Sequence, residues 1–372
     1  MRVEAVELRH VRIPLRRAFG HALHERDHAD AVLVSMRDEA GHVGWGEVQP
    51  RPYVTGETIE MVLDDLAAPL ATRLVGRELS SIDDAVQWIE AASTHMGRYL
   101  ATLCGFDLAL LDLAGQRFDV PAATVLGGPT HDALPPGVII GFEHETRDLA
   151  RYCATLRLSG KRHVKVKVGR DDDVERLQAV ARVWKGVPLR LDANAAWGSD
   201  QAIQRLFDIQ AVVPVASIEQ PVAADDLAGM RRIREATGVA VMADEAVCSL
   251  ADAQKLVDAR AADIFNVRLG KNGGLLAARR LVEFARRAGL GVHLGTMVGE
   301  TGVLSAAAEI FGRCIEGFDC LDGKGQNAFL LEVDILEDRS DDSAASGLGI
   351  RVSTERVAEH QVGPTRRLTE NA

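Results

Sequence analysis

Between residues 137 and 323, short apolar segments alternate with amphipathic ones, and this alternation restricts the possible fold more than any other feature of the chain. The apolar segments are GVIIGF, RHVKVKV, VPLRLD, ASIEQP, VAVMAD, DIFNVR, LGVHLG and FDCLDG. Stretches with helical periodicity, such as DDDVERLQAVARVW, separate them. Eight such units predict a closed parallel (β/α)-barrel of the TIM type. An open doubly wound sheet is the alternative, but no glycine-rich phosphate-binding fingerprint follows the first strand.

The first third of the chain has a different pattern, in which strands precede helices. Residues 31–48 predict two strands around a turn at 38–41, and helical patterns follow at 57–74, 80–95 and 98–117. This order indicates an α+β unit. We therefore expect three parts: an α+β capping domain (1–125), the catalytic barrel (126–325), and a C-terminal segment (326–372) that returns to the capping domain. The 372 residues suffice for a barrel of roughly 200–250 residues and a smaller domain.

Charge and cysteine content exclude several classes of protein. The formal net charge is −11, and no basic run is present, so nucleic acid is not an expected partner. The five cysteines are odd in number and show no metal-ligand spacing such as C-x-x-C, which predicts reduced thiols in a cytoplasmic protein. No apolar run has the length of a membrane span, and the N-terminus alternates like a strand rather than a secretion signal.

Polar residues stand at the predicted C-terminal ends of five successive strands. They are Lys167, Asp192, Glu219, Asp244 and Arg268, and their separations are 25, 27, 25 and 24 residues. Each separation is the length of one βα unit. Because the C-terminal ends of barrel strands meet at one mouth, we expect these five side chains to face one another there.

The three carboxylates of this set, Asp192, Glu219 and Asp244, belong to adjacent strands. Three acids at one mouth repel one another unless a cation neutralises them. Oxygen ligands without His or Cys favour Mg²⁺ over zinc. Any single acid could be a solvated loop residue, but three in register predict a site for one divalent cation.

Lys165 and Lys167 lie two residues apart and therefore on the same face of one strand. In a central barrel strand this face points inward, where two ammonium groups should lower the pKa of each other. A neutral lysine amine can serve as a general base near pH 7. A metal ion could hold the substrate carboxylate and stabilise the enediolate that forms when the α-proton leaves.

Several motifs resemble the enolase superfamily, in particular its muconate lactonizing enzyme subgroup within the mandelate racemase/muconate lactonizing enzyme family. The strand-end motifs are VKVKVG, RLDAN, SIEQP, MADE and NVRLGKNGG. GWGEVQPRPYVTGET is similar to the capping domain of that subgroup, and FDLALLDLAGQ to its junction with the barrel. The resemblance covers nearly the whole chain.

This resemblance implies a role for each strand-end residue. It implies that the three acids bind Mg²⁺, that Lys167 is the base, and that Lys165 is its electrostatic partner. Asn194 lies beside the metal and could contact the substrate. Glu245 follows a ligand, but strand alternation predicts that it points away from the mouth.

The sixth strand departs from the family pattern, because Arg268 stands where the family has a second lysine. Arginine is a poor base, although it can hold a carboxylate. Family members that racemise or epimerise use one base on each face of the substrate. We therefore expect a one-base reaction, either syn elimination of water (a dehydratase) or cycloisomerisation. Two alternatives remain: a racemase or epimerase of amino-acid derivatives or dipeptides, and a non-catalytic paralogue that binds a carboxylate.

The remaining candidates would bind a small-molecule carboxylate substrate. Glu300 and Asp322 follow the seventh and eighth strands, although Cys320 replaces the first acid of the Asp-x-Asp pattern found in dipeptide-binding relatives. In the capping domain, Phe19, His21 and His24 could contact substrate, as could Tyr53 and Thr55. His293 fits a core histidine better than a catalytic one. The relatives are oligomeric, which predicts a homo-oligomer.

Overall fold

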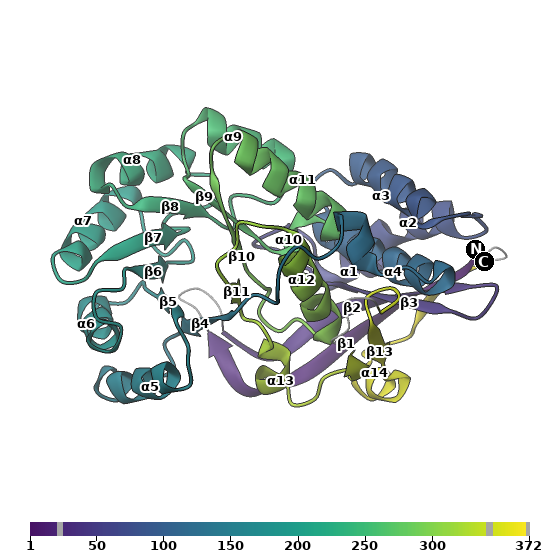
Figure 1. Ribbon diagram of the computed structural model, residues 1–372, viewed down its shortest axis with the longest axis horizontal. Helices are drawn as coiled ribbons and strands as arrows, with labels where there is room; N and C mark the ends of the chain where they lie inside the picture. The colour runs from purple at the N-terminus through teal and green to yellow at the C-terminus, as the bar shows by residue number, and fades with distance from the viewer. Residues whose placement is uncertain (21–24, 340–344, 370–372) are drawn as a thin grey trace.

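The computed structural model describes residues 1–20, 25–339 and 345–369. Its central element is a closed barrel of parallel strands in the order β10-β11-β4-β5-β6-β7-β8-β9 (Figure 1). The strands are β4 (Pro136–Ile140), β5 (His163–Lys167), β6 (Leu189–Asp192), β7 (Val215–Glu219), β8 (Ala240–Ala243), β9 (Ile264–Val267), β10 (Gly291–Leu294) and β11 (Leu321–Asp322). The predicted barrel is confirmed, and each of its strands coincides with one of the apolar segments.

The register between neighbouring strands brings the strand-end residues to one level of the barrel. Lys167 on β5 pairs with Asp192 on β6, and Asp192 pairs with Glu219 on β7. β9 lies diametrically opposite β5 in the closed order of the strands. Residues that follow β9 therefore reach the mouth from the side opposite Lys167.

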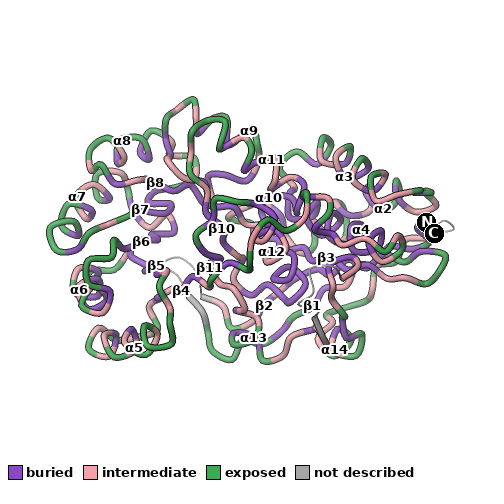
Figure 2. Tube along the Cα trace, viewed as in Figure 1, coloured by how far each residue is buried: buried purple, intermediate pink, exposed green. Residues whose placement is uncertain are grey.

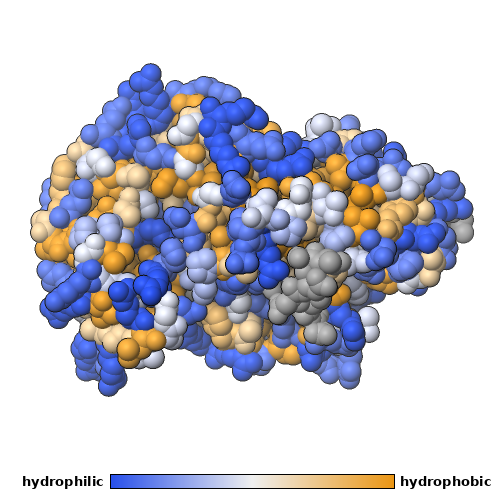
Figure 3. Space-filling model, viewed as in Figure 1, coloured by the Kyte–Doolittle hydropathy of each residue, from blue (hydrophilic) through white to orange (hydrophobic). Residues whose placement is uncertain are grey.

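Helices surround the barrel, and most of them bury one face (Figure 2). They are α5 (Thr146–Leu158), α6 (Asp173–Val183), α7 (Ser199–Gln210), α8 (Leu227–Thr237), α9 (Leu250–Asp258), α10 (Leu269–Asn272), α11 (Gly274–Arg287), α12 (Gly302–Cys314) and α13 (Gln326–Leu330). In α7, for example, Ala202, Leu206 and Ile209 are buried, at the spacing of one helical face. Figure 3 shows polar residues over much of one molecular face, with apolar residues scattered among them.

The capping domain is built on an antiparallel sheet in the order β14-β1-β2-β3. Its strands are β1 (Val3–Gly20), β2 (Glu25–Asp38), β3 (Val43–Val48) and β14 (Arg366–Thr369), and its helices are α1 (Ile59–Met61), α2 (Ala67–Leu74), α3 (Ile82–Met96) and α4 (Leu100–Phe118). A π-helical turn, Val62–Leu66, joins α1 to α2. A 3₁₀ turn, Ala122–Leu126, precedes the barrel.

Helix α4 packs directly onto the backbone of β3, because glycines line the contact. A Cβ atom added to Gly46 would lie 1.9 Å from the carbonyl oxygen of Gly105, and one added to Gly44 would lie 2.3 Å from that of Ala109. Only glycine permits such an approach. This contact fixes β3, and with it the loop that leads from β3 to the barrel mouth.

Two buried carboxylates of the capping domain bind the N-termini of barrel helices. Glu47 accepts hydrogen bonds from the backbone N–H groups of Thr301 and Leu304 at the start of α12. Asp107 on α4 accepts one from Leu275 N, 2.8 Å away, at the start of α11. A carboxylate is stabilising at a helix N-terminus, so these contacts hold the capping domain against the barrel.

After the barrel, the chain forms β12 (Leu336–Arg339), β13 (Ile350–Val352) and α14 (Thr354–His360) before β14 pairs with β1. The three-part division at residues 125 and 325 stays a prediction. Within the described part of the chain, no helix combines the length and apolar character that crossing a membrane requires.

Candidate active site

Three buried carboxylates stand at the mouth of the barrel. Asp192 and Glu219 end β6 and β7, and Asp244 directly follows β8; each is 1–2% exposed. Among the described residues, the Asp244 oxygens are contacted by cations as ion pairs rather than through well-aligned hydrogen bonds: Arg268 Nη2 lies 2.6 Å from Oδ2 and Lys271 Nζ lies 3.4 Å from Oδ1. Three buried acids this close together need positive charge around them, and the structure supplies it from side chains.

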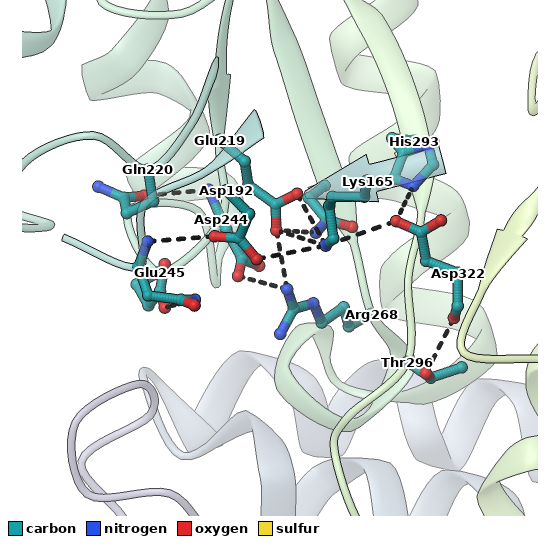
Figure 4. A network of polar contacts seen from close by, with 12 residues as sticks. Lys165, Asp192, Glu219, Gln220, Asp244, Glu245, Arg268, His293, Thr296 and Asp322 are labelled. Carbon is teal, nitrogen blue, oxygen red and sulfur yellow. Dashed lines mark hydrogen bonds and ion pairs between the residues drawn. The ribbon is translucent and has the colours of Figure 1, made fainter. Parts of the chain in front are cut away.

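Lys165 is the first of these cations (Figure 4). Its Nζ lies 3.0 Å from Glu219 Oε2, 3.5 Å from Asp192 Oδ2 and 3.4 Å from Asp322 Oδ2. Burial lowers the pKa of Lys165, but the three carboxylates outweigh it and raise the pKa above its ordinary value. The expectation that the lysine pair depresses this pKa is therefore wrong for Lys165, because its carboxylate neighbours lie closer than we assumed.

Lys167 lines the cavity. Its Nζ donates a hydrogen bond to the Oδ1 atom of Asn194 and lies 3.6 Å from Asp192 Oδ2. Asn194 has a φ of 44°, in the left-handed region that asparagine tolerates better than most residues. This backbone turn after β6 places the amide beside the lysine, so both predicted positions lie together at the cavity wall.

Arg268 directly follows β9 and reaches the acids from across the barrel (Figure 4). Its Nη2 lies 2.6 Å from Asp244 Oδ2 and 2.9 Å from Glu219 Oε1. Although burial lowers the pKa of Arg268, Asp244 and Glu219 raise it above the ordinary range. Arg268 is therefore a fixed cation between two of the expected metal ligands.

Asp322 lies at the end of β11 and is held by basic side chains. Arg190 Nη2 is 2.8 Å from its Oδ1, and His293 Nε2 is 2.9 Å from its Oδ2. His293, Cys320 and Asp322 form the one group of three possible metal ligands, among residues 1–20, 25–339 and 345–369, whose ligand atoms lie within 4.8 Å of one another. Arg190 also contacts His293 and Cys320, so its guanidinium interacts with all three residues of this group.

The three expected metal ligands do not form such a group, because cations separate them. Lys165 lies between Asp192 and Glu219, and Arg268 lies between Glu219 and Asp244. The donor set nevertheless fits Mg²⁺, since it consists of buried carboxylate oxygens on neighbouring strands. The guanidinium of Arg268 supplies Glu219 and Asp244 with a positive charge that a divalent ion would otherwise supply.

A cavity opens above these residues and has walls from both domains. Its barrel walls include Lys165, Lys167, Asp192, Asn194, Glu245, Arg268 and Asp322. The capping domain contributes Arg26, Arg51, Tyr53 and Val54. Arg26 and Arg51 were not predicted as site residues from the sequence, because no periodicity distinguishes them from ordinary charged residues.

Two further residues lie near Asp244, and the first differs from expectation. Glu245 lines the cavity rather than pointing away from it, and burial, followed by the charge of Asp244, raises its pKa to about 8. Strand β8 ends at Ala243, so the alternation of a strand no longer applies at Glu245. Lys271 lies in α10, and its buried Nζ donates to the carbonyl oxygens of Asp244 and Val247.

The other predicted substrate contacts have varied positions. Glu300 is buried, accepts hydrogen bonds from Ser305 Oγ and Met297 N, and is not among the residues that line the cavity. Phe19 belongs to β1, but its side chain, like the whole of His21 and His24, lies outside the described residues. Tyr53 lines the cavity, whereas Thr55 is buried and is not among the residues that line it.

Family comparisons match both domains. Residues 148–356 match the enolase C-terminal domain-like family, and residues 3–127 match the N-terminal domain of mandelate racemase and muconate lactonizing enzyme. The chain belongs to the mandelate racemase/muconate lactonizing enzyme family of the enolase superfamily. This confirms the resemblance that the strand-end motifs indicated.

Relatives within the enolase superfamily catalyse more than one reaction. L-Ala-D/L-Glu epimerase of Bacillus subtilis is 29% identical over 313 residues, which cover 83% of this chain and 84% of the relative. o-Succinylbenzoate synthase of Geobacillus stearothermophilus is 32% identical over 309 residues, which cover 81% of this chain and 79% of that protein. The chain is thus similar to enzymes, and epimerases and racemases predominate among them.

Solved structures of this superfamily share the fold. N-succinyl Arg/Lys racemase of Bacillus cereus superposes with a TM-score of 0.88 at 25% identity, and the match covers 99% of this chain and all of that one. A dipeptide epimerase of Enterococcus faecalis, complexed with Mg and the dipeptide L-Leu-L-Tyr, gives a TM-score of 0.82 at 26% identity and covers 94% and 99% of the two chains.

Proposed function

We propose that this protein is a Mg²⁺-dependent racemase or epimerase that removes the α-proton of an amino-acid derivative next to its carboxylate. The observation that carries the proposal is the unequal environment of the two lysines. Both line the cavity, but Lys165 is enclosed by three carboxylates, whereas Lys167 is hydrogen-bonded to Asn194 and lies 3.6 Å from Asp192 Oδ2. The names of the relatives support racemisation and epimerisation better than the elimination or cycloisomerisation that we expected from Arg268.

Asp192, Glu219 and Asp244 would hold the Mg²⁺ ion. Bound there, the ion would orient the substrate carboxylate and neutralise the negative charge that develops as the α-proton leaves. Lys165 contributes a fixed positive charge to the same region, because its three carboxylate neighbours keep it protonated. Its positive charge also limits the repulsion among these acids in the folded protein.

Lys167 would take the α-proton. Its Nζ extends from the end of β5 into the cavity, and Asn194 orients it through a hydrogen bond to Oδ1. An oriented amine at the reacting carbon provides general-base catalysis, which contributes roughly 10²–10⁴-fold to the rate. Residues of the capping domain, such as Tyr53, line the same cavity.

Inversion requires a proton on the face opposite Lys167, and Arg268 is the group placed there. β9 lies across the barrel from β5, so Arg268 approaches the substrate from the opposite wall. Despite burial, Asp244 and Glu219 hold the pKa of Arg268 above its ordinary range, so its guanidinium gives up a proton with difficulty. We therefore expect inversion to be slower than removal of the α-proton.

Syn elimination of water is the second candidate, and Arg268 is the observation that favours it. An elimination in which Lys167 acts on a single face needs no second base, and a fixed guanidinium can stabilise a carboxylate. The similarity to o-succinylbenzoate synthase is consistent with this reading.

Proton NMR in D₂O with Mg²⁺ tests the proposal on a panel of N-acylated amino acids, dipeptides and hydroxy acids. Exchange of the α-proton together with inversion, present in the wild type and lost in Lys167→Ala, supports racemisation or epimerisation. Loss of water, without inversion of the α-carbon in the substrate that remains, would assign the second candidate instead. A circular dichroism spectrum unchanged by the substitution controls for misfolding.

A further inference from the structure

Arg190, on β6, reaches across the interior of the barrel to Asp322 at the end of β11. We propose that Arg190 is a positioning residue for the proposed reaction. It fixes the carboxylate of Asp322, and Asp322 in turn fixes the ammonium group of Lys165 beside the expected metal ligands. The proposal rests on the proposed function, because it concerns the positive charge that Lys165 contributes to the site.

The contact between Arg190 and Asp322 is bidentate. Nη2 of the arginine donates to Oδ1 at 2.8 Å, and Nη1 donates to Oδ2 at 3.0 Å. Two parallel hydrogen bonds from a planar guanidinium fix the plane of a carboxylate as well as its position. β4 and β5 separate β6 from β11 in the closed order of the strands, so the pair spans the barrel interior. The orientation of Asp322 therefore depends on a residue of a strand that does not neighbour its own.

The backbone of β4 further limits the positions open to the Asp322 carboxylate. Asp322 pairs with Gly137 in the register of β11 and β4, and a Cβ atom added to Gly137 would lie 1.9 Å from Asp322 Oδ1. Glycine permits this close approach because it has no side chain. At the other oxygen, His293 Nε2 lies 2.9 Å from Oδ2. The carboxylate is thus confined by backbone at one oxygen and by a basic side chain at the other.

Asp322 is also one of the three carboxylates that surround Lys165. Its Oδ2 lies 3.4 Å from Lys165 Nζ, and in Figure 4 the lysine lies between Asp322 and the acids Asp192 and Glu219. The attraction of Asp322 therefore opposes that of the two expected metal ligands. Because of this balance, the position of Nζ depends on where Arg190 holds Asp322. Without Arg190, Asp322 would draw Lys165 away from Glu219.

A contribution to stability alone explains the Arg190–Asp322 pair poorly. A largely buried ion pair adds little stability compared with apolar residues of similar volume, because both charges lose their hydration. The Asp322 side chain is 2% exposed and that of Arg190 is 17% exposed, so this cost applies here. The contact of the same carboxylate with Lys165 supplies a functional reason for the pair.

The test uses a double-mutant cycle of Arg190→Met, Asp322→Asn and the variant with both changes. The rate of α-proton exchange in D₂O with Mg²⁺ gives kcat and KM for a compound that the wild type exchanges. Each single change should lower kcat by about 10- to 100-fold, the range for a misplaced catalytic group. The loss should fall on kcat more than on KM, because the enediolate carries more negative charge than the bound carboxylate.

The double variant should be no slower than the slower single variant, because it leaves neither charge of the pair without its partner. Independent roles would instead multiply the two losses, and that result would overturn the proposal. A KM increase confined to Asp322→Asn would also overturn it, because it would assign Asp322 to the substrate. Arg279→Met is the control for the loss of an arginine, since Arg279 donates to the carbonyl oxygen of Val125 and does not line the cavity.

Gly137→Ala tests the position of Asp322 without changing any charge. Its Cβ would displace the carboxylate, so we expect kcat to fall by about 10-fold while the circular dichroism spectrum stays unchanged. Gly198→Ala, whose Cβ meets no atom within 4 Å, should retain the wild-type kcat. If Arg190→Met does not fold, Gly137→Ala decides, and a wild-type kcat in this variant overturns the proposal.

Calorimetry with Mg²⁺ alone separates this proposal from the proposed function. If the wild type exchanges no compound, the proposed function fails, and the affinity for Mg²⁺ then decides about Arg190. In Arg190→Met, Lys165 should leave Glu219 freer for the ion, so Mg²⁺ should bind about 3- to 10-fold more tightly than in the wild type. The wild-type affinity should persist in Arg279→Met. Equal affinities of Arg190→Met and wild type would overturn the proposal.

Discussion

The Nη2 atom of Arg268 lies 2.6 Å from Oδ2 of Asp244, and the same atom lies 2.9 Å from Oε1 of Glu219. One side chain therefore forms ion pairs with two of the three carboxylates that we propose as Mg²⁺ ligands. A metal ion and this guanidinium compete for the same oxygens, and binding of the ion requires Arg268 to change its contacts.

Replacing Arg268 with methionine tests this competition. Without the guanidinium, Asp244 and Glu219 lose a buried counter-charge, so the metal-free variant should be less stable than the wild type by about 3–5 kcal/mol. Mg²⁺ should then raise its Tm by more than it raises that of the wild type, because the ion replaces the missing charge. Calorimetric melting with Mg²⁺ and with EDTA measures both effects.

Arg231→Met is the control for this experiment, because Arg231 is an exposed residue paired with Glu235. It should change neither the Tm nor the response to Mg²⁺. An equal Mg²⁺-induced increase in Tm for Arg268→Met and wild type would show that Arg268 and the ion do not compete.

Arg268→Lys should change the balance between inversion and exchange. Lysine can both donate and accept a proton, whereas arginine is protonated at all ordinary pH values. We expect the wild type to exchange the α-proton for deuterium faster than it inverts the centre, and the variant to bring the two rates within about an order of magnitude of each other. Proton NMR gives the exchange rate, and polarimetry gives the inversion. If the exchange and inversion rates of the variant differ as much as those of the wild type, Arg268 does not act on the substrate face opposite Lys167.

Asp107 should make the stability of the protein depend on pH. Burial raises its pKa to about 7, although the backbone N–H groups of Leu275 and Leu276 oppose the shift. The folded protein therefore binds the Asp107 proton more tightly than the unfolded chain. Its contribution to stability is present below the unfolded pKa of about 4 and is lost as the pH rises toward 7.

Asp107→Asn removes this titration and retains an oxygen for Leu275 N. The free energy of unfolding of the variant, measured in urea, should fall less between pH 4 and pH 7 than that of the wild type. The exposed Asp65→Asn serves as the control, and it should follow the wild-type curve. If Asp107→Asn also follows that curve, the carboxyl of Asp107 does not titrate in this range.

Gly46→Ala should weaken the contact between β3 and α4. The added Cβ would meet the carbonyl oxygen of Gly105 at 1.9 Å, so the two elements must separate. We expect a loss of about 1–3 kcal/mol, as for overpacked cores, or more because backbone has to shift. Gly198→Ala is the matched control, since no atom lies within 4 Å of its added Cβ and its φ is −82°. Urea denaturation measures both variants, and equal stability would contradict the tight contact.

The amino-acid sequence by itself determined the barrel and the level of its strand-end residues. A βα unit has a nearly constant length, and the ends of parallel strands meet at one mouth, so Lys167, Asp192 and Glu219 could be brought together from their spacing alone. The register between β5, β6 and β7 agrees with this prediction. The family likeness added the sixth-strand position, where Arg268 replaces a lysine.

Only the tertiary structure decided which charges meet. The distance between two side-chain ends depends on rotamers and on the lengths of loops, which carry no periodic signal. Lys165 thus proved to be enclosed by three acids, and Glu245 turned into the cavity because β8 ends before it. Arg26 reached the same cavity from a separate domain, because packing of the capping domain against the barrel, and not sequence spacing, sets its position.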